Sequence, residues 1–149
     1  MAEPLDLSGA KIGQFDEIPP NWYEAHVHEV TPIEIDNDNG KLPMGTPGYN
    51  VQFKVDGGEY DGRSVFNRFY LPDPAQYDEG KTMTARGRFV DFLVAVGYSK
   101  DDVMSGKWKF DADDLVGREC RVSVGVKDGY NTVRNFKPVG ANVEEAGII

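Results

Sequence analysis

The chain has 149 residues, of which 40% are hydrophobic and 28% charged, and its net charge is −9 at pH 7. This composition is typical of one soluble globular domain, and no apolar run approaches the roughly 20 residues that a membrane-spanning helix needs. The first residues lack the basic start and apolar stretch of a secretory signal, and a single cysteine excludes an internal disulfide. We therefore expect a cytoplasmic protein without a membrane partner.

Acidic and basic residues are unevenly distributed along the chain. Residues 1–62 carry 12 acidic and 3 basic side chains, whereas residues 63–138 carry 11 acidic and 13 basic ones. All seven arginines lie between Arg63 and Arg134. The acidic total argues against a histone-like polycation, but a local basic groove can still bind phosphates.

The first half of the chain predicts an irregular arm followed by three strands. Residues 1–20 form the arm, because the prolines at its end exclude a helix. A first strand from Trp22 has an imperfect inward face, and a Gly- and Pro-rich loop over 36–48 follows it. That inward face is Tyr23, Ala25, Val27, Thr31, Ile33 and Ile35.

The second and third strands, 49–55 and 63–71, flank a turn over 56–62. The alternation in RSVFNRFYL assigns Val65 and Phe69 to the core and turns Phe66, Arg68 and Tyr70 outward. One bulge would exchange these two faces.

A helix follows a loop over 72–81. Phe89, Phe92, Leu93 and Val96 recur at helical spacing, and Gly97 is placed to end the helix. Residues 99–117 predict one or two short helical turns, with Ser99 and Asp111 as N-caps.

The last two strands are predicted from Cys120 to Val126 and over 131–138, joined by a tight turn at Asp128-Gly129. Cys120 is expected to be a buried structural thiol. Residues 140–149 are expected to form a short acidic and apolar tail.

The element order is strand, strand, strand, helix, strand, strand. It predicts a mainly β domain over 21–139: a five-stranded OB-fold Greek-key barrel with one α-helix between strands 3 and 4. An open antiparallel sheet with one packed helix has the same order and stays an alternative.

In an OB-fold, strands 2 and 3 and the loops joining strands 1–2 and 4–5 bind oligonucleotides. Single strands need rings for base stacking and cations for phosphates, and both occur on this face. Alternatively, Phe66 and Tyr70 pack beneath the helix or the arm. The candidates here are Asn50, Gln52, Lys54, Arg63, Phe66, Arg68, Tyr70, Lys127 and Tyr130.

Further candidates lie outside this face. Arg86 and Arg88 either reach phosphates or are solvated residues of the helix surface. Trp108, next to Lys107, either stacks on a base or closes the end of the barrel. Arg121 and Arg134 point outward from strands 4 and 5 and would extend a basic track.

Catalytic and metal-binding patterns are weak. Glu24, His26 and His28 form E-x-H-x-H, which offers three zinc ligands, but the chain has no other histidine. We find no phosphate-binding glycine loop, no G-x-S-x-G and no cysteine cluster. We expect no enzyme activity, cofactor or metal. A metal-dependent hydrolase that uses Glu24, His26 and His28 stays open as an alternative.

Several pieces of sequence follow one another in a family-like order: IPPNWYEAHV, GYNVQFKV, G-x-Y-x-G-R with F-x-x-F over 58–69, FVDFLVAVG, DLVGRECRVSV and N-x-V-x-x-F-x-P over 131–138. Across 18–138 the chain resembles single-stranded DNA-binding proteins of tailed bacteriophages. This resemblance implies an OB-fold, sequence-tolerant binding of single strands and a role in phage DNA replication or recombination in an infected bacterium. It also implies that the tail, with Glu144 and Glu145, recruits replication or recombination proteins.

Other functions stay open from sequence. An OB-like protein-interaction module that binds or inhibits a host or phage protein is the main alternative, and the acidic residues 1–62 favour it. A preference for DNA over RNA and a homo-oligomeric state are also undecided.

Overall fold

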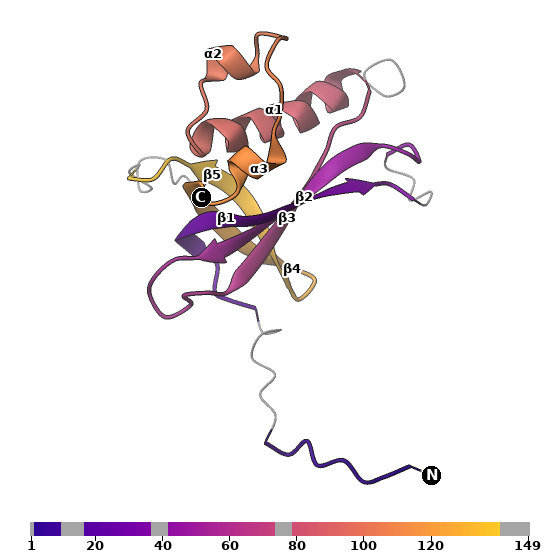
Figure 1. Ribbon diagram of the computed structural model, residues 1–149, viewed down its shortest axis with the longest axis vertical. Coiled ribbons are helices and arrows are strands. Elements are labelled where there is room, and N and C mark those ends of the chain that lie inside the picture. The colour runs from indigo at the N-terminus through magenta and orange to yellow at the C-terminus, as the bar shows by residue number, and fades with distance from the viewer. Residues whose placement is uncertain (1, 10–16, 37–41, 74–78, 141–149) are drawn as a thin grey trace.

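The computed structural model describes residues 2–9, 17–36, 42–73 and 79–140. The predicted tail, apart from Gly140, lies outside them. Residues 2–9 contain no helix or strand and extend away from the body of the molecule (Figure 1). The arm joins the fold at Ile18, which is buried and exchanges two 2.9 Å hydrogen bonds between its backbone and the side-chain amide of Asn131.

The five predicted strands form one antiparallel sheet. They are β1 (Asn21–Glu34), β2 (Pro47–Val55), β3 (Ser64–Tyr70), β4 (Glu119–Lys127) and β5 (Tyr130–Lys137), in the order β3-β2-β1-β4-β5. The long β1 pairs with β2 over most of its length and with β4 through Asn21–His26. The mainly β prediction is confirmed.

The sheet is curled but open. Its two edge strands approach each other, so that the ring of Phe69 in β3 lies 5.7 Å from that of Phe136 in β5. No hydrogen-bonded ladder joins β3 to β5 in the described part of the chain. The structure therefore contains a five-stranded antiparallel sheet that is not closed, which matches the alternative of an open antiparallel sheet with a packed helix.

Arg88 closes the space between the two edge strands. It lies in α1 (Glu79–Ala95) and donates hydrogen bonds to the Asn67 side-chain oxygen in β3 at 2.8 Å and to the backbone oxygens of Val133 and Arg134 in β5 at 2.6 and 2.7 Å. Burial lowers the pKa of its guanidinium. A side chain thus takes the place of backbone pairing between β3 and β5.

The inward face predicted for the first strand is wrong at Thr31, whereas Ile35, just after β1, is buried as predicted. The β1–β2 register shifts between Val27 and Glu29, and such a bulge reverses the alternation of side chains. Val30 therefore packs against the core, whereas Thr31 is exposed and opposite Asn50.

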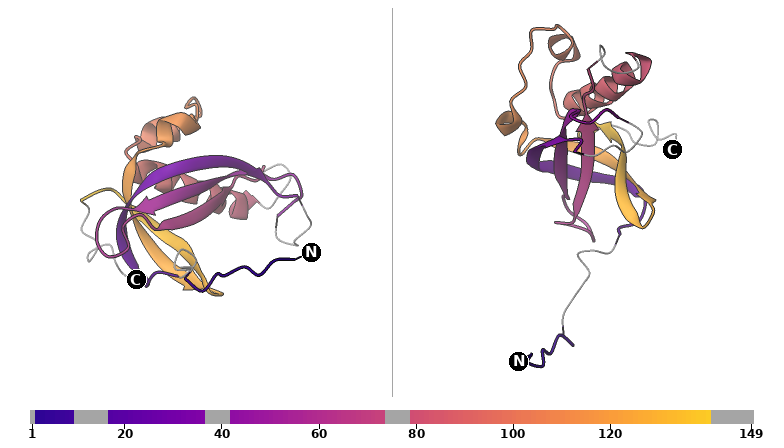
Figure 2. Two further views of the ribbon diagram at one scale, coloured as in Figure 1. Left: turned by 60° about the horizontal axis from the view of Figure 1, so that its bottom comes forward. Right: turned by 90° about the vertical axis from the view of Figure 1, so that its right-hand side faces the viewer.

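The helices lie at one end of the curled sheet (Figure 2). α1 begins at Glu79, inside the predicted loop, and ends before Gly97, whose φ of +106° confirms the predicted terminator. The short α2 (Lys100–Val103) and α3 (Ala112–Leu115) are capped by Ser99 and Asp111, as predicted. No helix in the described residues is both long and apolar enough to cross a membrane.

Aromatic side chains form the centre of the core. Phe53, Phe69 and Phe136 from the sheet pack with Phe92 of α1, with ring centroids 5.0–5.9 Å apart. Cys120 is buried beside them, as predicted, and burial raises its pKa to about 12. This core holds the backbone of β2 and β3 rigid, which determines where their outward side chains lie.

Candidate nucleic-acid interface

The outward side chains of β2 and β3 form one ordered surface. Register pairs align Lys54 with Ser64, Gln52 with Phe66, Asn50 with Arg68 and Gly48 with Tyr70. Val65 and Phe69 are buried on the opposite side, so the predicted parity of β3 is confirmed. We call this surface the β2–β3 outer face; its members are Asn50, Gln52, Lys54, Phe66, Arg68 and Tyr70.

Phe66 and Arg68 are the most accessible members of this face. Phe66 is 49% exposed and stacks on no other ring in the described residues. Arg68 is exposed and forms no ion pair or hydrogen bond with the described part of the chain. Within the residues that the structure describes, neither side chain is used to hold the fold together, and this leaves both accessible to a ligand.

Tyr70 is half-buried because its ring lies against the backbone of Gly48. A Cβ atom at position 48 would come within 2.3 Å of the Phe69 backbone oxygen and 3.0 Å of Cδ1 of Tyr70. The glycine is therefore needed for the close approach of β2 and β3. The Tyr70 ring lies beside this contact on the outer face.

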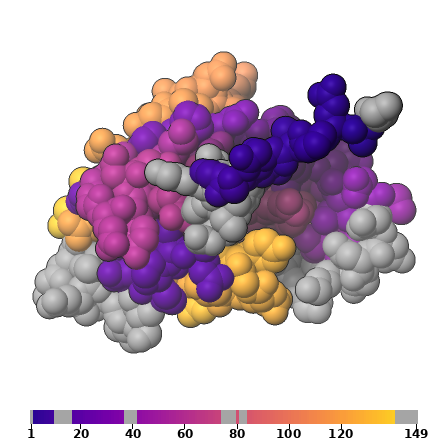
Figure 3. All heavy atoms as spheres, turned by 90° about the horizontal axis from the view of Figure 1, so that it is seen from below, coloured from indigo at the N-terminus to yellow at the C-terminus, as the bar shows by residue number. Residues whose placement is uncertain are grey.

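The β4–β5 hairpin presents a second ring. Asp128 and Gly129 have φ of 54° and 81°, the backbone of the predicted tight turn. Next to them Lys127 is exposed and Tyr130 is 75% exposed. This hairpin and the β2–β3 region are both visible from below (Figure 3).

Arg134 of β5 is also exposed, and its guanidinium lies over the backbone of Gly125. A Cβ atom at Gly125 would meet Nε of Arg134 at 2.1 Å. The guanidinium forms no ion pair with the described residues. It therefore adds a positive charge beside the hairpin.

Other predicted candidates have structural partners. Arg86 donates two hydrogen bonds to the Pro72 backbone oxygen, at 3.2 and 3.0 Å, Arg88 joins the edge strands, and Arg121 forms an ion pair of 3.3 Å with Glu24. Trp108 packs between Tyr98 and Phe110 against the core. The structure does not bring these four onto the β2–β3 outer face.

Two candidates lie at the margins. Arg63 is half-buried in the β2–β3 connection, where its backbone pairs with Val55 and Tyr60. Lys107 is exposed in the α2–α3 connection. Neither belongs to the β2–β3 outer face.

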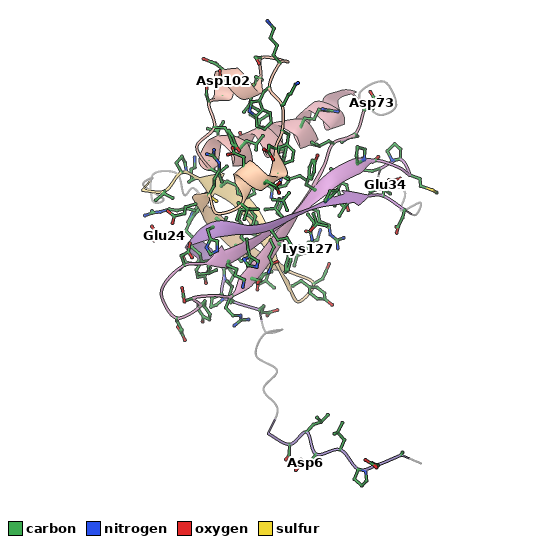
Figure 4. All side chains as sticks on the ribbon, in the orientation of Figure 1. Asp6, Glu24, Glu34, Asp73, Asp102 and Lys127 are labelled. Atoms are coloured by element: carbon green, nitrogen blue, oxygen red, sulfur yellow. The ribbon has the colours of Figure 1, made fainter. Side chains whose placement is uncertain are left out.

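Acidic residues border the candidate face along β1. Glu29 is opposite Gln52 in the neighbouring strand, and Glu24 lies at the other end of β1 from Glu34 (Figure 4). Sequence reasoning missed that Glu29 and Thr31 share this surface, because it did not predict the bulge at His28. The apolar Val30 at an even position was the one available signal.

Glu24, His26 and His28 of the E-x-H-x-H sequence do not share one partner, and each contacts a different neighbour within the described residues. Nδ1 of His26 lies 2.7 Å from the Asp56 carboxylate, Glu24 pairs with Arg121, and the rings of His26 and His28 are 6.4 Å apart. Within the described residues no three potential ligands gather into a metal site.

Comparisons with known proteins add no relationship. Neither the scan against models of protein families nor the search of curated proteins finds a match to this chain.

Proposed function

We propose that this protein binds single-stranded DNA on the β2–β3 outer face, without catalysis and with little preference for base sequence. The observation that carries the proposal is the row of Phe66, Arg68 and Tyr70 on one side of β3. An exposed ring and a guanidinium that have no partner among the described residues, with a second, half-buried ring on the same side, are what a stacking platform with a phosphate contact needs. The role follows from the resemblance: DNA replication or recombination of a tailed bacteriophage.

We further propose that the curled sheet is a variant of the OB-fold. Its central strand β1 pairs with both β2 and β4, its main helix lies between β3 and β4, and β3 approaches β5. These relationships agree with a five-stranded, partly open Greek-key barrel. In this proposal the Arg88 contacts replace the closing ladder.

The spacing of the two rings determines how a strand could lie. Side chains on one side of a strand repeat every two residues, so Phe66 and Tyr70 are about 13 Å apart along β3. Stacked rings have centroids only about 4.5–7 Å apart. Each ring would therefore stack on its own base, with Arg68 facing the backbone between them.

Binding should depend on salt, because cations that neutralise phosphates release counterions. Lys54, Arg68, Lys127 and Arg134 are the cations on or near the face. If three or four of them contact phosphates, log K should fall with log salt concentration with a slope of about −2 to −3.

The test is fluorescence anisotropy with labelled oligo-dT, mixed-sequence single strands and the matching duplex, over about one decade of salt from roughly 25 to 300 mM, across which such a slope changes the affinity by about two to three decades. Single strands should bind and the duplex should bind more weakly. No binding to any single strand at micromolar protein and low salt would overturn the proposal. Single-stranded RNA in the same series decides the preference between DNA and RNA.

A protein-interaction module is the second candidate, and the acidic border of the face favours it. Glu29 lies in the same register row as Gln52 and Phe66, where a negative charge opposes phosphate. Capture of a protein that survives nuclease treatment, together with no oligonucleotide binding, would select this alternative.

A further inference from the structure

A pocket of about 390 Å³ lies on another part of the molecule, between α1 and the end of β5. One wall consists of α1 residues that include Val90, Asp91 and Val94, and the other of the consecutive residues 135–138. Trp22 of β1 and Lys100 of α2 complete the lining. Its size is in the range of pockets that hold small ligands or a few residues of a peptide.

The pocket runs along an unpaired sheet edge. β5 is the last strand of the sheet, and no described strand pairs with its outer side. Arg88 occupies that edge only at the backbone oxygens of Val133 and Arg134. An edge strand facing a helix is a geometry in which an extended peptide can add a strand and place alternate side chains in the groove.

The pocket also offers polar groups without partners. Asn135 can both donate and accept, as a peptide backbone requires. Lys100 and Lys137, which form no ion pair with described residues, outnumber the single carboxylate of Asp91.

We propose that this pocket is a docking site for an extended, acidic peptide segment of a partner protein, with one aliphatic side chain inserted between Val94 and Pro138. The peptide backbone pairs with the edge of β5 beyond Arg134. Its flanking carboxylates face Lys100 and Lys137. The aliphatic walls suit a leucine or valine side chain better than a nucleobase, which needs partners along its whole edge.

This docking site is separate from the β2–β3 outer face and does not depend on the proposed function. The pocket is lined by residues of α1, α2, β1 and the chain from 135 to 138, and none of them belongs to the β2–β3 outer face. Loss of peptide binding should therefore leave oligonucleotide binding unchanged.

The test uses a fluorescein-labelled octapeptide with a central leucine between threonines and two glutamates at each end, titrated by anisotropy with the full-length protein. We expect binding that weakens at least tenfold in Lys137→Glu. Lys109→Glu makes the same charge change outside the pocket and serves as the control, with binding within twofold of the wild type. A peptide N-methylated at alternate residues should lose binding, because it cannot form the β5 ladder.

Three results would overturn the proposal. The first is no binding of the peptide, and the second is equal binding of a version with lysines in place of the glutamates. The third is that the peptide binds a chain shortened to end at Gly140, whose circular dichroism is unchanged, but does not bind the full-length chain. Residues 141–149 would then themselves be the occupant of the pocket, in place of a partner protein. Equal binding to the full-length and shortened chains supports a partner protein.

Discussion

Arg88 in α1 donates a 2.8 Å hydrogen bond to the side-chain oxygen of Asn67 in β3, while its guanidinium lies over the ring of Phe136 in β5, 5.2 Å from the ring centroid. One cation thus touches both edges of an open sheet. Its hydrogen bonds to two β5 carbonyls use the groups that a closing strand would have paired. The arginine is a structural element rather than a free surface charge.

Replacing Arg88 should therefore destabilise the fold. Arg88→Met keeps much of the aliphatic length but leaves Asn67 and two β5 carbonyls without their donor, and we expect the free energy of unfolding to fall by about 2–3 kcal/mol. Urea denaturation followed by circular dichroism measures this. Arg68→Met is the matched control, because Arg68 has no partner among the described residues; the stability of this variant should stay within about 0.5 kcal/mol of the wild type. Equal stability of the two variants would contradict the role given to Arg88.

The two faces of β3 should respond oppositely to alanine. Phe66→Ala and Tyr70→Ala should each weaken binding to oligo-dT by about 5- to 150-fold, which corresponds to the roughly 1–3 kcal/mol of one base-stacking contact. Phe69→Ala removes a buried ring and should lower the unfolding free energy by about 3–5 kcal/mol. Anisotropy and urea denaturation on all three variants separate binding from folding. Unfolding of Phe66→Ala would show that this ring supports the core.

Alanine substitutions at two glycines should change the stability of the protein in opposite directions. Gly48→Ala places a methyl group against the Phe69 backbone oxygen, which cannot move without disturbing the β2–β3 ladder, so we expect a loss of about 1–3 kcal/mol. Gly87 lies in α1 with nothing within 4 Å of its would-be Cβ, so Gly87→Ala should gain about 0.5–1 kcal/mol. Thermal or urea unfolding distinguishes them, and a stable Gly48→Ala variant would refute the close approach.

Tyr98 should make stability depend on pH under alkaline conditions. Burial and a hydrogen bond to Asp114 raise the pKa of Tyr98 to about 12. Between the ordinary tyrosine value of about 10 and this value, the unfolded chain loses the proton while the folded chain keeps it. Stability is therefore present below pH 10 and declines as the pH rises towards 12.

Melting temperatures from pH 8 to about 11.5 measure this decline. Tyr98→Phe should be less stable at pH 8 but lose less of its stability on going to high pH. Tyr130→Phe, at the exposed hairpin tip, should keep the wild-type slope. The same hydrogen bond lowers the pKa of Asp114, so the wild type should lose its advantage over Tyr98→Phe as the pH falls below about 4.

Local sequence signals predicted much of the strand and cap structure. The alternation around Val65 and Phe69 identified the buried side of β3, because a strand in register with one core cannot exchange its two faces. Ser99 and Asp111 were recognised as caps because their side chains satisfy backbone donors only a few residues away. The turn at Asp128-Gly129 is likewise determined within two residues.

Relationships between distant segments could not be predicted in this way. Arg88, Arg121 and Trp108 look like surface or ligand-binding residues in sequence, yet their partners are 21 to 97 residues away or belong to the packed core. The bulge at His28 turned Val30 towards the core and Thr31 towards solvent, because the hydrogen-bonded register with β2 determines the side-chain directions more strongly than the alternation of residue types. The closure of the sheet was also invisible, since element order is the same for an open and a closed arrangement.

The sequence by itself determined which residues form strands and caps and which side of β3 is apolar, because those choices depend on neighbours along the chain. Only the tertiary structure decided which cations are free. Arg68 lies on the β2–β3 outer face with no partner in the described part of the chain, whereas Arg88 is enclosed between two strand edges. The physical reason is that a guanidinium binds any carbonyl, carboxylate or aromatic ring that lies close enough. Which of these groups lie close to it depends on tertiary packing and not on its neighbours in sequence.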